Sequence, residues 1–140
     1  MALVRLSLLG LLFVAAIARA EGISTDTAVE IRQIISEQLA AFRADDANRA
    51  FSFASPEIQH RFGNPERFLA MVKRGYAPVY RPRRVSFESI DMVQGRPVQR
   101  VLVWDQSDQA YIALYSLSHT EALGWRITGC VLKPAKGQTL

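Results

Sequence analysis

The spacing of apolar residues changes midway along the 140-residue chain, and this change most constrains its fold. Before residue 84, apolar residues recur at three- and four-residue intervals, which predicts amphipathic helices. After that point, apolar and polar residues tend to alternate between short turns, which predicts strands. We therefore expect an α+β fold in which N-terminal helices pack on a curved four-stranded antiparallel meander, giving a cone-like shape.

Capping residues mark the expected helix starts. Residues 27–30 fit a capping box and predict that a long first helix begins there. Asp46, Ser55 and Asn64 are expected to cap three further helices, because their short polar side chains bond free amides of the first turn. Gly75 suits the left-handed residue just past the fourth helix. The predicted strands cover residues 85–93, 98–104, 109–118 and 125–132.

The first twenty residues resemble a cleaved export signal. Arg5 precedes an almost unbroken apolar run over residues 6–18, and Ala18 and Ala20 occupy the positions that a signal peptidase reads. The run is shorter than the roughly 20 residues that a membrane-spanning helix needs, although a retained anchor is the alternative. We expect cleavage after Ala20 and a single mature domain, residues 21–140, in the periplasm or outside a bacterial cell.

The basic residues of the mature chain are concentrated locally. Removing Arg5 and Arg19 leaves 15 basic against 13 acidic residues and lowers the formal net charge from +4 to +2. We do not expect nucleic acid as a partner, because such a protein would carry more positive charge. A short basic stretch instead suggests contact with an anionic envelope surface or an acidic partner, the alternative being a solvated loop. Its residues are Lys73, Arg74, Arg81, Arg83 and Arg84.

The order of elements, with the closing segment Gly-Trp-Arg-Ile-Thr-Gly at residues 124–129, resembles the nuclear transport factor 2-like superfamily, the cystatin-like α+β cone. Four motifs resemble, more narrowly, a family of short exported bacterial proteins defined only as a domain of unknown function. They are Asp-Asp at 45–46, Ser-Pro-Glu-Ile at 55–58, Arg-Phe-Gly at 61–63 and Gly-Tyr-Ala-Pro-Val-Tyr-Arg-Pro at 75–82. The broader resemblance implies a cone with a cavity, and the narrower one implies no activity.

Aromatic residues on the predicted sheet and on its approach are candidate ligand contacts. If their rings line the cone, they can orient a small amphipathic molecule, the alternative being that they only fill the core. The candidates are Tyr76, Tyr80, Trp104, Tyr111 and Tyr115.

Asp91 is the candidate catalytic base. It is the only carboxylate well inside a predicted strand, and its alternation partners include Val85, Phe87 and Val93. Such an apolar face would raise its pKa, whereas a solvated strand aspartate is the alternative. We expect no metal site and no cofactor, because neither His60 nor His119 has a partner at a metal-ligand spacing. Cys130 is the only cysteine, which excludes an intrachain disulfide, and is expected to be a buried strand thiol.

These features favour a non-catalytic exported module that binds an unknown small molecule or acidic partner through a cavity with a basic rim. One alternative is a small isomerase- or hydrolase-like enzyme that uses the cavity. Another is a homodimer that associates through the sheet. The sequence identifies neither the ligand nor the partner.

Overall fold

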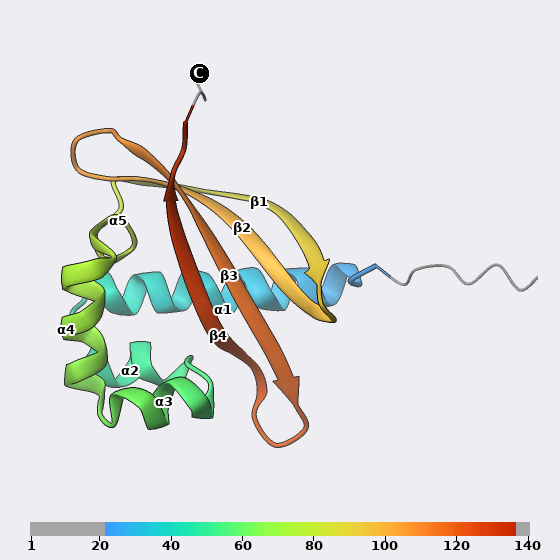
Figure 1. Cartoon of the computed structure of the whole chain (residues 1–140). Helices are drawn as coiled ribbons and strands as arrows, with labels where there is room; N and C mark the ends of the chain where they lie inside the picture. Colours follow the sequence, from blue (N-terminus) through green and yellow to red (C-terminus); the bar gives the residue numbers. More distant parts are fainter. Residues whose placement is uncertain (1–21, 137–140) are drawn as a thin grey trace, which may run out of the picture.

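The computed structural model describes residues 22–136, and the expected signal peptide over residues 1–20 lies outside them. Helices precede an antiparallel sheet, which confirms the α+β fold class (Figure 1). The helices are α1 Thr25–Arg43, α2 Ala47–Ser52, α3 Pro56–Phe62, α4 Pro65–Gly75 and α5 Ala77–Tyr80. The strands are β1 Arg84–Val93, β2 Arg96–Trp104, β3 Ala110–Thr120 and β4 Gly124–Pro134.

The helix starts follow the predicted caps except at α1. The side chains of Asp46, Ser55 and Asn64 accept hydrogen bonds from backbone amides three residues ahead, which confirms these caps. Helix α1 begins earlier than predicted, because Ser24 lies in an extended conformation and its Oγ accepts from the Thr27 amide at 3.2 Å. Thr27 is therefore inside the first turn, and the capping-box prediction was wrong by one turn.

The prediction for Gly75 was also wrong. Gly75 is the last residue of α4, and the glycines with positive φ in residues 22–136 are Gly63, Gly95 and Gly124. The Tyr76 amide still donates to the Val72 carbonyl at 2.9 Å, and the chain continues directly into the short helix α5. A left-handed turn is not needed here, because the chain does not reverse direction at this point.

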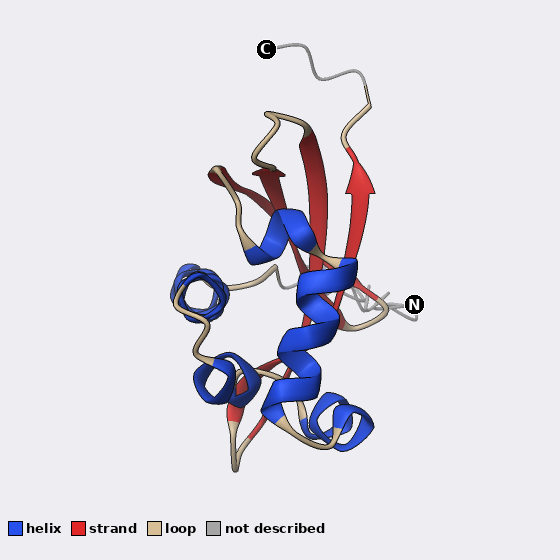
Figure 2. Ribbon diagram, turned by 90° about the vertical axis from the view of Figure 1, so that its left-hand side faces the viewer, coloured by secondary structure: helices blue, strands red, loops and turns tan. Residues whose placement is uncertain are grey.

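The four strands pair in sequential order and antiparallel throughout. The turn between β1 and β2 consists of Gln94 and Gly95, whose φ angles of 50° and 77° fit the two-residue turn that matches strand twist. In Figure 1 the strands fan apart, α1 runs across the sheet, and α2, α3 and α4 gather near the C-terminal end of α1. Figure 2 shows the sheet behind α4 and α5, so that the helices enclose one of its faces.

The core lies between the helices and this inner sheet face. Helix α1 contributes Ile31, Ile35, Leu39 and Phe42 at helical spacing, as the apolar pattern predicts. Alternate residues of the strands meet them from the sheet. These are Val101, Val103, Ala113, Tyr115, Leu117 and Ile127.

Strand β1 contains a bulge. The register passes from the pair Phe87 and Val101 directly to the pair Ile90 and Gln99, so two residues of β1 face one of β2. A bulge of this kind reverses the alternation of side chains beyond it. Ile90 consequently packs against the core, whereas Asp91 is exposed.

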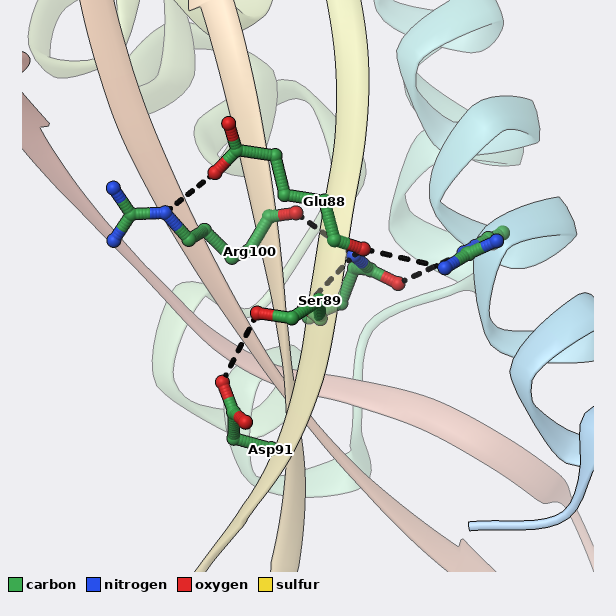
Figure 3. Close-up of polar contacts among 6 residues, drawn as sticks. Glu88, Ser89, Asp91 and Arg100 are labelled. Atoms are coloured by element: carbon green, nitrogen blue, oxygen red, sulfur yellow. Dashed lines mark hydrogen bonds and ion pairs between the residues drawn. The ribbon is translucent and has the colours of Figure 1, made fainter. Parts of the chain in front are cut away.

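The fully buried amide of Gln99 holds the bulge in place (Figure 3). Its Nε2 donates to the carbonyls of Glu88 and Ser89 at 3.0 and 3.2 Å. Its Oε1 accepts from Nε of Arg32 on α1 at 3.3 Å. Glu88 lies in the bulge, and its carboxylate accepts a hydrogen bond from Nε of Arg100 at 2.5 Å. Gln99 thus ties the bulge to α1.

Candidate functional site

A cavity of about 190 Å³ lies between the helices and strands β3 and β4. Most of its wall is apolar and buried, with contributions from α1, α3, α4, α5 and the inner sheet face. The wall consists of Gln38, Phe42, Ala54, Ile58, Arg61, Phe62, Phe68, Met71, Val72, Tyr76, Val79, Tyr115, Ile127, Thr128, Gly129 and Cys130.

A backbone bridge positions α3 at this cavity. The Ser55 amide donates to the Ile127 carbonyl and the Ile127 amide donates to the Phe53 carbonyl, both at 2.8 Å. The segment before α3 is thereby fixed against β4. Ile58 and Arg61 are three residues apart on α3 and therefore share the helix face that lines the cavity.

Phe68 of α4 is the centre of an aromatic cluster beside the cavity. Its ring centroid lies 6.0 Å from that of Phe42, 5.4 Å from that of Phe51 and 5.7 Å from that of Phe62. These separations fall in the range in which aromatic rings attract one another beyond simple burial. Three of the four rings also line the cavity, so much of its wall is built from interlocked aromatic side chains.

The Tyr115 hydroxyl is the most distinctive polar group of the cavity. Tyr115 is 1% exposed, and its hydroxyl has no hydrogen-bond partner within residues 22–136. Burial raises the pKa of Tyr115 well above its ordinary value, and the neighbouring Cys130 thiol adds to this effect without forming a well-aligned hydrogen bond. The hydroxyl therefore stays neutral at pH 7.

The remaining polar groups of the wall have different roles. The Gln38 amide donates to the Ala50 carbonyl at 3.1 Å and is therefore already engaged. Burial raises the pKa of the Cys130 thiol to about 12, so it remains protonated at neutral pH and is a poor nucleophile. Arg61 is exposed and has no ion pair within residues 22–136. Together with the partly exposed Phe62 and Tyr76, it marks the mouth of the cavity.

The structure separates the five aromatic residues predicted to contact a ligand. Tyr76 and Tyr115 line the cavity, whereas Tyr111 packs against the core without lining it. Tyr80 is partly buried against the core without lining the cavity, and its hydroxyl donates to Asp45. Trp104 lies outside the main core, where the Arg84 guanidinium stacks 3.9 Å from its ring centroid.

Internal ion pairs neutralise much of the basic stretch. Asp45 pairs with Arg81 at 3.0 Å and with Lys73 at 3.4 Å, and Arg83 pairs with Asp108 at 2.9 Å. The Tyr80 hydrogen bond, followed by the two cations, lowers the pKa of Asp45.

Arg84 stacks on the Trp104 ring. Arg74 is therefore the one residue of the basic stretch that has neither an ion pair nor a stacking partner within residues 22–136. Four of the five cations thus have a partner within the described residues, and the anion-binding role of the stretch stays a prediction.

Asp91 is not part of the cavity. The predicted apolar surroundings were wrong, because the bulge places its carboxylate on the exposed side, where Ser89 Oγ donates to it at 3.2 Å. The enzyme hypothesis thereby loses its only candidate base. Within residues 22–136, no three His, Cys, Asp or Glu side chains come together as metal ligands.

The sequence analysis did not predict much of the cavity wall, notably Phe42, Ile58, Arg61 and Phe68. Helical spacing placed Phe42 and Phe68 on the inner faces of their helices, but it did not show which faces meet. The bridge between the segment before α3 and β4 decides that arrangement, and no local pattern predicts it.

Comparison with protein families finds a match. A family described as a domain of unknown function, DUF4864, matches residues 24–140. The chain belongs to this family. Every cavity residue lies in the range that matches DUF4864, and the match confirms the expected resemblance to a domain of unknown function. Comparison with curated proteins and with solved structures found no match. In the described part of this DUF4864 chain, no helix is long and apolar enough to cross a membrane.

Proposed function

We propose that the protein is a non-catalytic binding module whose cavity holds a small, mainly apolar molecule with a hydrogen-bond acceptor. The observation that carries this proposal is the aromatic-walled cavity, whose lining residue Tyr115 has a buried hydroxyl without a hydrogen-bond partner in residues 22–136. An engineered apolar cavity of about 150 Å³ admits benzene. The 190 Å³ found here therefore suit one ring with a short polar group.

The chemistry of the wall supports binding over catalysis. The described residues of the wall include no Asp, Glu or His that would act as a base. The Cys130 thiol, with a pKa of about 12, would be protonated at neutral pH. An apolar wall with a few polar groups is the common composition of a small-molecule site.

Export and membership of the nuclear transport factor 2-like superfamily are further parts of this proposal. The pattern of residues 1–20 supports export, and the long helix α1 across a twisted meander supports the superfamily. Sequencing the N-terminus of protein from the cell envelope tests export. We expect Glu21 as the first residue, and intact Met1 on cytoplasmic protein would contradict it.

One observation favours self-association as a second function. The sheet face away from α1 has an apolar centre, and Val131 on it is 53% exposed. Its neighbours there include Val98, Ile112 and Leu114, which are partly buried. Sedimentation at micromolar concentration tests this function, and a strict monomer would exclude it.

Titration with benzamide, observed by nuclear magnetic resonance, tests the cavity proposal. Benzamide combines one ring with a carbonyl acceptor, and we expect saturable shifts at Ile58 and Ile127, which line the cavity. Met71 lines the cavity and is partly exposed, so Met71→Trp is expected to fill it and abolish these shifts. The matched control Ala70→Trp places the same ring on an exposed position of α4 outside the cavity. Absence of saturable shifts in the unmodified protein, or equal shifts in both variants, would overturn the proposal.

A further inference from the structure

Arg61 is the only charged residue in the described cavity wall. The other wall residues are apolar or neutral, and no acidic side chain lies among them. Among the described wall residues, only the Arg61 guanidinium brings a formal charge to the mouth. A guanidinium presents a planar set of donors that matches the two oxygens of a carboxylate.

Arg61 also differs from the five cations of the described domain that form ion pairs. Arg49, Arg81, Arg83, Arg100 and Lys73 have carboxylate partners within 3.4 Å. Arg61 has no ion pair or side-chain hydrogen bond within residues 22–136, although Glu57 lies one turn earlier on α3. Its donors are thus available at a place where the wall provides no competing acid.

We propose that the ligand is a small monocarboxylate, with its apolar body in the cavity and its carboxylate on Arg61 at the mouth. This inference rests on the proposed function and adds the chemical class of the ligand. One cation matches one negative charge, which favours a monocarboxylate over a doubly charged phosphate ester. The volume limits the body to about one ring, by comparison with the benzene-sized cavity of about 150 Å³.

Benzoate and benzamide provide a matched pair of probes. They share ring, carbonyl and size, and they differ mainly in charge. We expect the unmodified full chain to bind benzoate about tenfold more tightly than benzamide, because a charge-assisted hydrogen bond is stronger than a neutral one. Raising the salt concentration to about 1 M shortens the Debye length to about 3 Å and should reduce this preference.

Arg61→Gln is expected to remove the preference for benzoate, so that the affinities for the two probes lie within about twofold of each other. Arg74→Gln is the matched control, because Arg74 is exposed and unpaired within residues 22–136 and does not line the cavity. This control should bind both probes as the unmodified chain does. A thermal melt of each variant shows that it is folded.

The possible outcomes separate the two proposals. Equal affinity for both probes, or a benzoate preference that survives in Arg61→Gln, would overturn the carboxylate inference and leave the cavity proposal standing. A preference lost equally in Arg74→Gln would also overturn it, because the effect would then come from net charge. Failure of both probes to bind the unmodified chain would overturn both proposals.

Discussion

Replacing Gln99 by leucine should destabilise the domain, because its buried amide holds the bulge of β1. The variant removes the Gln99 donor to the Ser89 carbonyl and the Gln99 donor to the Glu88 carbonyl. The Glu88 carbonyl still accepts a hydrogen bond from Nη2 of Arg32 at 3.2 Å. A buried acceptor left without a donor costs about 1–3 kcal/mol. Allowing for the partial replacement by Arg32 and for the apolar leucine side chain, we expect a loss of about 2 kcal/mol.

Urea and thermal unfolding followed by tryptophan fluorescence measure this loss. For a domain of this size, 2 kcal/mol should lower the melting temperature by roughly 6–10 °C. The control Gln33→Leu makes the same change on the exposed side of α1 and should stay within about 0.5 kcal/mol. In addition, the effects of Arg32→Ala and Gln99→Leu should not be additive, because the two side chains are hydrogen-bonded to each other and share the Glu88 carbonyl as acceptor.

Equal stability of Gln99→Leu and Gln33→Leu would refute this reasoning. It would mean that the Glu88 and Ser89 carbonyls find other donors at no cost. Additive effects of the Arg32 and Gln99 variants would likewise show that the two side chains do not act together.

Three further predictions concern single side chains. Tyr115→Phe should leave the melting temperature of the ligand-free protein unchanged or raise it, because burying a hydroxyl without a hydrogen-bond partner costs about 1–3 kcal/mol. A clear decrease would show that the hydroxyl makes a stabilising hydrogen bond. Burial raises the pKa of Cys130 to about 12, so stability should fall as pH rises from the ordinary thiol pKa of about 8.5 toward 12. Cys130→Ala should show a smaller fall between pH 7 and 10 in urea unfolding, and an identical fall would contradict this. The pKa of Asp45 is lowered, mainly by its hydrogen bond with Tyr80. The ionised Asp45 should therefore stabilise the fold fully above the ordinary carboxyl pKa of about 3.9, and this stabilisation should be lost as the pH falls below that value. Asp45→Asn is a suitable variant because Asn tolerates the positive φ of 52° at this residue. Between pH 7 and pH 3 the variant should lose less free energy of unfolding than the unmodified protein, and an equal loss would contradict the assignment.

Local chemistry made much of the fold predictable. Asp46, Ser55 and Asn64 each bond a backbone amide three residues ahead, and this interaction needs no distant partner. The strands were predictable for a similar reason, because alternation and turn residues such as Gly95 act over a few positions. The start of α1 was missed because residues 27–30 fit the capping-box pattern, whereas the side chain that caps the helix is that of Ser24, one turn earlier.

The cavity depends instead on contacts between distant segments. The bridge from Phe53 and Ser55 to Ile127 brings α3 onto β4, and this contact has no sequence signature. The bulge is similar, because Gln99 satisfies carbonyls ten or eleven residues earlier and thereby moves Asp91 to the exposed side. Strict alternation placed Asp91 among apolar neighbours because it could not anticipate the extra residue.

Contacts between bound benzamide and the protein, measured as intermolecular nuclear Overhauser effects, test the central claim most directly. The account predicts effects from the probe ring to the methyl groups of Ile58 and Ile127, and their loss in Met71→Trp. Effects to Val131 on the opposite sheet face instead, or none to the cavity residues at saturating probe, would contradict the claim that this cavity is the binding site.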